Sequence, residues 1–115
     1  MIDNEITILI VTYKSDEILL KNLTNLKKFN VIVIDNFKNS NLKTKIVNFT
    51  NVKYIKKDKN LGEAAGADSG LKLIKTKYTL YLNPDTLIDE INILKLKSIF
   101  LRYDHTGLLT PLHLN

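Results

Sequence analysis

The residues best suited to chemistry stand where short apolar runs stop. Runs of β-branched and aromatic residues are typical of strands buried in a parallel sheet, and open α/β sheets bind ligands outside the carboxyl ends of their strands. Hydroxyl, amide and carboxylate groups at such ends can bind a nucleobase or ribose, and carboxylates can supply hard oxygen ligands to Mg²⁺ or Mn²⁺. The groups in question are Thr12-Tyr13, Asp35-Asn36, Asn60-Leu61-Gly62 and Asn83-Pro84-Asp85.

The tripeptide Asn83-Pro84-Asp85 ends the apolar run 78–82. Pro84 cannot donate to a strand ladder, so the strand must stop there. Asp85 then has two alternative roles. It is either a turn residue that caps the next segment of the chain, or a ligand of a divalent cation that neutralises a diphosphate. On this segment alone the turn role is favoured, and the metal role depends on what the rest of the chain places beside Asp85.

The elements that must position these groups alternate along the chain. The apolar runs predict strands at 6–11, 31–35, 52–55 and 78–82, with one more short strand at 107–110. Helical spacing and capping residues predict helices from Ser15 to about residue 28, at 42–49, at 63–74 and from Asp89 to about residue 103. This alternation predicts an α/β fold with a mostly parallel sheet and helices on both faces. The four polar groups should then converge at one edge of the sheet.

Composition sets the class of the protein. A chain of 115 residues forms one domain, spanning 1–115, and 44% hydrophobic with 25% charged residues is typical of soluble globular chains. The lack of cysteine excludes disulfides and thiolate metal sites and is compatible with a reducing compartment. The start of the chain does not resemble a signal peptide, and the apolar runs are too short to span a bilayer. We therefore expect a cytoplasmic protein.

The formal net charge is +5, and Arg102 is the one arginine among seventeen basic residues. Sequence-specific nucleic-acid readers need arginines and stacking aromatics, so we expect no nucleic-acid partner. The lysines are scattered along the chain, and the favoured interpretation is that they form a solvated surface. The alternative is attraction to a phosphorylated ligand or to anionic lipid head groups, which would place the protein peripherally at the inner face of the membrane.

Several familiar sites are missing from the sequence. The Walker pattern GxxxxGK[ST] is absent, and no GxGxxG comes after the first predicted strand, which argues against a dinucleotide fold. No Ser-His-Asp arrangement is visible. His105 and His113 are too isolated for a metal cluster and are expected at the surface.

In order and spacing, the segments 8–15, 31–36, 60–62 and 81–86 resemble glycosyltransferase family 2, which has the GT-A fold. Residues 107–111 are similar to the next strand of that family, so the resemblance covers about residues 5–112. It implies a Rossmann-like GT-A fold, truncated after its donor-binding part. It also implies a nucleotide-diphospho-sugar donor (UDP- or dTDP-sugar), Mg²⁺ or Mn²⁺, and inverting transfer to a glycan or lipid-linked acceptor in polysaccharide synthesis.

The resemblance also implies roles for single residues. Thr12 and Tyr13 would line the nucleotide pocket, Asp35 would bind the base, and Asp85 would be the metal ligand. The full donor-binding set that it implies is Thr12, Tyr13, Asp35, Asn36, Asn60, Gly62, Asn83 and Asp85.

The chain departs from the family pattern at three places. Asn83 replaces the first aspartate of the metal motif, and Ala67-Asp68 replaces an Arg-Asn or Asn-Asn pair. The acceptor-binding half, which carries the catalytic base of the family, is not in this sequence, and Asp104 lies too early to serve as that base. No catalytic residue is therefore assigned.

These departures favour an alternative, a nucleotide-sugar-binding or interaction module that lacks transfer activity. A flavodoxin-like or receiver domain is a third class, but a receiver needs paired acids after the first strand and Thr12-Tyr13 supplies none. We also predict a homodimer that buries an open strand edge or the apolar helix that begins near Asp89.

Overall fold

A single parallel sheet organises the chain. The structure, a computed structural model, describes residues 2–60 and 62–102. Four strands form the sheet in the order β3-β2-β1-β4, and every neighbouring pair is parallel. The strands are β1 (Asp3–Thr12), β2 (Phe29–Asp35), β3 (Val52–Lys56) and β4 (Tyr78–Leu82), and the helices are α1 (Asp16–Leu23), α2 (Leu42–Lys45), α3 (Gly62–Leu71) and α4 (Glu90–Arg102).

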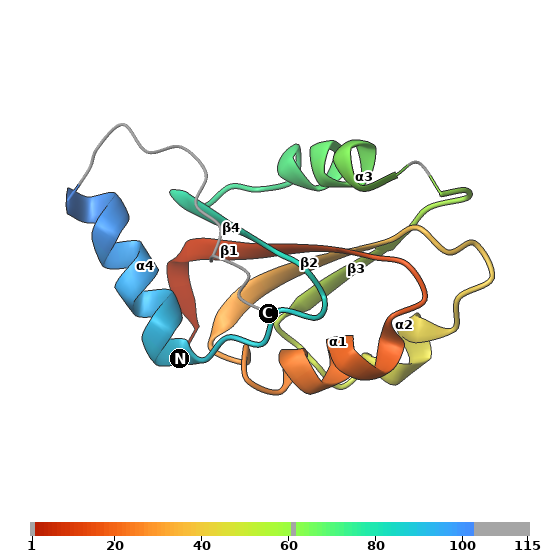
Figure 1. Ribbon diagram of the computed structural model, residues 1–115, viewed down its shortest axis with the longest axis horizontal. Coiled ribbons are helices and arrows are strands. Elements are labelled where there is room, and N and C mark those ends of the chain that lie inside the picture. Colours follow the sequence, from red (N-terminus) through yellow and green to blue (C-terminus); the bar gives the residue numbers. More distant parts are fainter. Residues whose placement is uncertain (1, 61, 103–115) are drawn as a thin grey trace.

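Helices cover both faces of the sheet, as the sequence predicts. Helices α1 and α2 lie on one face and α3 lies on the other (Figure 1). Since side chains alternate along a strand, the core has two parts. Ile8 and Ile10 of β1 pack with α1, α2 and α4, whereas Leu9 and Val11 pack under α3.

Strand β1 is an inner strand of the sheet, and its register with β2 and β4 determines which residues of these strands lie side by side. Ile8 pairs with Val31 of β2 on one side and with Leu80 of β4 on the other. Residues 6–12 are all buried. A strand enclosed on both faces and both edges is mostly apolar, and in this one Thr7 and Thr12 are the buried polar residues. This pattern is why the sequence predicts the strand.

Helix α3 packs unusually close to the sheet through two glycines. A Cβ on Gly66 would lie 2.9 Å from Val11 Cγ1, and a Cβ on Gly70 would overlap Leu9 Cδ1. Glycine costs a helix about 1 kcal/mol relative to alanine. These contacts explain why glycine is present at both positions despite this cost.

The predicted helix ends are wrong in three places. Helix α1 ends at Leu23 and not near residue 28, because Asn25 and Leu26 donate to carbonyls three residues back, at Asn22 and Leu23. Leu26 is still fully buried, so it contributed to the leucine periodicity from outside the helix. In the same way α2 is only four residues long, and α3 stops at Leu71.

The caps differ in their chemistry. Ser15 occupies the N-cap position of α1, but its hydroxyl donates to the Tyr13 carbonyl and does not cap the helix. Asp89 does cap α4, since its Oδ1 accepts from the Asn92 N–H at 2.9 Å.

The predicted strand at 107–110 and the residues Asp104, His105 and His113 lie outside the described residues. Within the described ranges, no helix has the length and apolar character needed to cross a membrane.

Candidate functional site

The carboxyl ends of the strands form one edge of the sheet. Thr12 pairs with Asp35 at the end of β2, and Leu82 at the end of β4 pairs with Ile10. The chain passes from β1 to β2 and β3 on one side, and then returns to place β4 on the other side of β1. The order therefore reverses between β1 and β4, which is where open α/β sheets bind their ligands.

Thr12 and Asn36 are buried at this edge with unused hydrogen-bonding capacity. The Asn36 backbone N–H donates to the Thr12 carbonyl at 2.9 Å, which holds the two strand ends together. Asn36 Nδ2 also donates to the Gly62 carbonyl at 3.1 Å. Thr12 Oγ1 and Asn36 Oδ1 find no partner among the described residues. Buried polar atoms without partners are rare in folded proteins, so both are candidates to bind a ligand.

Asp35 is held by two donors of the chain. The Phe37 backbone N–H donates to Oδ1 at 3.0 Å, and the Tyr54 hydroxyl donates to Oδ2 at 2.7 Å. Burial, together with the hydrogen bond to Asp35, raises the pKa of Tyr54 well above its usual value. Asp35 itself is only 1% exposed. Each carboxylate oxygen can accept a second hydrogen bond.

Tyr13 and Phe37, which follow the ends of β1 and β2, form an aromatic pair. Their rings meet edge to face with centroids 5.7 Å apart. Lys14 Nζ lies 5.3 Å from the Tyr13 centroid and 4.9 Å from that of Phe37. Lys14 has a φ of 56°, a conformation that non-glycine residues rarely adopt outside functional sites and turns.

A cavity of about 440 Å³ adjoins this pair. Its lining combines Phe37 and Lys14 with polar residues from the start of α1, from the loop before α2 and from the end of α2. These polar lining residues are Ser15, Asp16, Glu17, Ser40, Asn41 and Lys45.

Asn60 and Gly62 build the turn that starts α3. Asn60 Oδ1 accepts from the Gly62 N–H at 2.9 Å, and Gly62 adopts a φ of +82° that favours glycine. The Asn60 side-chain oxygen is thus used in shaping the turn. The resulting turn brings the Gly62 carbonyl to Asn36.

Asn83 and Asp85 lie on a β-turn directly after β4. The Thr86 N–H donates to the Asn83 carbonyl at 3.0 Å, which places Pro84 and Asp85 at the two central positions. Both Asn83 and Asp85 are exposed. No group of three or more acidic, histidine or cysteine side chains that could hold a metal ion occurs within the described ranges.

The turn after β4 is attached to α1 by a residue that the sequence did not single out. Asn22 Nδ2 donates to the Thr86 carbonyl at 2.7 Å. Asn22 is fully buried. Its position three residues after Leu19 and one before Leu23, inside the leucine stripe of α1, is the signal that could have identified it.

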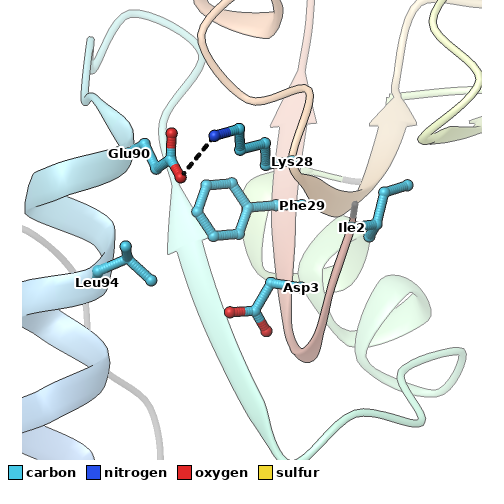
Figure 2. A pocket seen from close by; sticks show the side chains of 6 residues that line it. All are labelled: Ile2, Asp3, Lys28, Phe29, Glu90 and Leu94. Atoms are coloured by element: carbon cyan, nitrogen blue, oxygen red, sulfur yellow. Dashed lines mark ion pairs between the residues drawn. The ribbon is translucent and has the colours of Figure 1, made fainter.

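Another cavity, of about 330 Å³, lies at the opposite edge of the sheet (Figure 2). Its lining includes Asp3 at the start of β1, Phe29 at the start of β2, and the Lys28–Glu90 ion pair at 3.3 Å. This cavity is therefore at the amino ends of the strands, away from the candidate site.

The arrangement of strand ends agrees with the comparison with protein families. The profile described as "Glycosyl transferase family 2" matches residues 7–111. The chain belongs to glycosyl transferase family 2. No curated protein matches it significantly.

A solved structure of S. aureus TarS, residues 1–349, is similar to the family 2 chain. The TM-score is 0.73 at 20% sequence identity, over 87% of this chain and 33% of that one. The chain thus spans about one third of the length of the TarS structure, and the likeness establishes the GT-A fold. The fold class expected from the resemblance, a Rossmann-like parallel sheet with helices on both faces, is confirmed.

One departure from the family 2 pattern, at Asp68, and a neighbouring contact of α3 now have a structural context. Asp68 is exposed and pairs with Lys72 at 3.4 Å, one turn later on α3. Near the start of α3, Glu63 Oε1 accepts from the Tyr81 hydroxyl at 2.6 Å. Burial and this carboxylate raise the pKa of Tyr81 above its usual value. Glu63, from α3, is thus tied to β4 two residues before Asn83.

Proposed function

We propose that this chain binds the nucleotide-diphospho-sugar donor of a family 2 glycosyltransferase, a UDP- or dTDP-sugar, at the carboxyl edge of its sheet. The observation that carries the proposal is the edge itself, where Thr12 Oγ1 and Asn36 Oδ1 are buried without partners among the described residues. The family match supports it. In this proposal the nucleobase of the donor lies near Tyr13 and Asp35, and its diphosphate lies toward β4.

The residues at the end of β4 fit a divalent cation of the Mg²⁺ or Mn²⁺ type. Asp85 offers an exposed carboxylate and Asn83 an exposed amide oxygen, and both are hard oxygen donors. Mg²⁺ commonly takes one or two carboxylates and fills its remaining positions with water and substrate phosphates. When bound, such a cation would neutralise the diphosphate and stabilise it as a leaving group. Asp85 is proposed to hold it.

The other donor-binding residues act by position. Asn60 and Gly62 shape the turn that brings the Gly62 carbonyl to Asn36. Asn36 in turn holds the end of β2 against Thr12. The proposed acceptor is a glycan or lipid-linked hydroxyl compound, with inversion at the transferred sugar. The base that would deprotonate the acceptor is not assigned to any residue of this chain.

Calorimetry with UDP and dTDP, with and without Mn²⁺, tests this function. We expect binding of one of the two nucleotides that Mn²⁺ strengthens. Asp85→Ala should lower the affinity for the nucleotide in the presence of Mn²⁺ by at least about tenfold, which corresponds to about 1.4 kcal/mol of binding free energy. Glu5→Ala is the control, because Glu5 is also exposed but lies near the amino end of β1, at the opposite edge of the sheet. Absence of nucleotide binding at millimolar concentration would overturn the proposal.

The alternative is a module that binds the nucleotide sugar and does not transfer the sugar. Asn83 favours it, because an amide in place of a carboxylate removes one negative charge beside the proposed cation. Incubation with a UDP- or dTDP-sugar and Mn²⁺, and then assay for released nucleoside diphosphate, separates the two functions. Donor binding without release in the presence of acceptor glycans would support the module.

A further inference from the structure

Asn22 is a buried polar residue whose hydrogen bonding serves a loop distant in sequence. It lies on α1 between Leu19 and Leu23, which are both fully buried. Its Nδ2 donates to the Thr86 carbonyl at 2.7 Å, across 64 positions of sequence. Its Oδ1 is buried and finds no partner within the described residues. A buried amide with an unused acceptor destabilises a core relative to an apolar residue, so stability alone does not explain asparagine here.

The hydrogen bond from Asn22 ends on the turn that carries Asp85. The Thr86 N–H closes this turn on the Asn83 carbonyl at 3.0 Å, and the Thr86 carbonyl accepts from Asn22. Pro84 fixes its own φ on the other side of Asp85. The backbone of Asp85 is therefore held between a rigid residue and an anchored one.

The anchor itself is rigid. Helix α1 packs on the sheet through Leu19 and Leu23, and its first turn comes shortly after Thr12 and Tyr13. After the turn, the chain runs back toward α4 along the face of the sheet that α1 covers (Figure 1). One short helix thus begins beside the proposed nucleotide pocket and ends at the turn of the proposed metal ligand.

We propose that Asn22 is a positioning residue that holds the turn 83–86, and with it the Asp85 carboxylate, in the geometry that binds the divalent cation of the donor complex. This inference rests on the proposed function, because it assigns Asn22 a role toward Asp85. It adds a residue from α1 to the determinants of that site.

The test compares Asn22→Leu, which keeps the size of the side chain and removes its donor, with the native chain. The measured quantity is the gain in UDP or dTDP affinity on adding Mn²⁺. Loss of a group that orients a metal ligand typically lowers metal affinity by about 10- to 100-fold. We therefore expect Asn22→Leu to reduce the Mn²⁺-dependent gain by about tenfold and to leave metal-free nucleotide binding within about twofold.

Two further variants exclude a merely structural role. Leu19→Ala opens a cavity in the same helix without touching the turn, so it should lower thermal stability and keep the Mn²⁺-dependent gain. In an Asp85→Ala background, Asn22→Leu should have no further effect on that gain, since both substitutions act on one ligand. Amide hydrogen exchange gives a readout without ligand. Asn22→Leu should speed exchange at the Thr86 N–H by about tenfold and leave the amides of β1 unchanged.

The outcomes separate the two proposals. A native chain without any Mn²⁺-dependent gain overturns the proposed metal role of Asp85 and the role of Asn22 together. If the native chain shows the gain and folded Asn22→Leu retains it within about twofold, the inference about Asn22 alone is overturned. Equal losses in Asn22→Leu and Leu19→Ala would also overturn it, because the effect would then track stability.

Discussion

At the scale of the residue, Asp35 shows how the chain keeps a carboxylate buried at the carboxyl edge. Its two oxygens accept from the Phe37 N–H and from the Tyr54 hydroxyl. We predict that Tyr54→Phe lowers the free energy of unfolding by about 2 kcal/mol, because it removes a hydrogen bond to a buried charged group. Urea unfolding monitored by circular dichroism measures this loss.

Tyr81→Phe is the matched control for Tyr54→Phe. The Tyr81 hydroxyl also donates to a carboxylate, but its acceptor Glu63 is exposed. The free energy of unfolding should then fall by less than about 1 kcal/mol. Equal losses in the two variants would contradict the view that the burial of Asp35 makes the difference.

The residues of the candidate site were predictable to different degrees. Asp35 and Asp85 could be predicted because each carboxylate comes at or just after the end of an apolar run, and such a pattern can be recognised from the sequence alone. Tyr54 and Asn22 could not, since each acts through a contact with a residue far along the chain, Asp35 and Thr86 respectively. Their function depends on the strand order and on the face that α1 covers.

At the scale of the element, α3 illustrates a conflict between helix propensity and packing. Gly70 would gain about 1 kcal/mol of helix propensity if replaced by alanine. Its Cβ would however overlap Leu9 Cδ1 and lie 3.3 Å from Ile34 Cγ1, both in the core. We predict that Gly70→Ala lowers the free energy of unfolding by about 1–3 kcal/mol, because overpacking exceeds the gain in propensity.

Ala64→Gly supplies the reference for Gly70→Ala. Ala64 is exposed on the same helix, so its replacement reports propensity alone and should lower the free energy of unfolding by about 1 kcal/mol. Thermal or urea unfolding of both variants measures the comparison. A more stable Gly70→Ala would show that α3 can move away from the sheet at little cost.

The anchoring of α4 gives a prediction about pH. Lys97 pairs with Asp3 at 2.9 Å and with Glu5 at 3.3 Å, which ties α4 to the start of β1. Burial alone would raise the pKa of Asp3, but hydrogen bonds from the Glu5 N–H and from Lys97 hold this pKa below its usual value of 3.8. A lowered carboxyl pKa stabilises the folded state above the usual value, and this stabilisation is lost as the pH falls through the lowered pKa.

We therefore expect Lys97→Met to flatten the loss of stability between about pH 5 and pH 2.5, because the variant has less of this stabilisation to lose. Urea midpoints at several pH values measure the effect. Lys28→Met is the control, since the Lys28–Glu90 pair is 62% and 41% exposed and should contribute little. Identical pH profiles for the native chain and Lys97→Met would contradict the assignment.

Element boundaries show where prediction from sequence fails. The bounds of β4 were predicted correctly, because Pro84 stops the strand whatever surrounds it. The ends of α1, α2 and α3 were not. Leu26 and Ile74 match helical spacing but pack into the core from turns beyond the helices. Periodicity reports which side chains are buried, and burial continues where the helix does not.

At the scale of the whole molecule, the alternation of strands and helices was sufficient to predict a parallel sheet covered on both faces. The order β3-β2-β1-β4 cannot be deduced from alternation, because periodicity does not tell on which side of β1 the fourth strand lies. That order decides which strand ends become neighbours. It creates the reversal between β1 and β4 on which the donor-binding proposal depends.

The predicted homodimer concerns the outer surface of α4. Ile91 and Leu94 are 65% and 42% exposed, and Leu87 and Ile2 add exposed apolar surface. Exposed apolar surface often marks an interface with another chain. We expect sedimentation equilibrium at tens of micromolar to give the mass of a dimer, and Ile91→Glu to shift it to a monomer. Lys95→Glu is the control, because Lys95 is exposed on the same helix and is already charged. A native chain that sediments as a monomer would contradict the prediction, whereas a dimer unaffected by Ile91→Glu would place its interface on another surface.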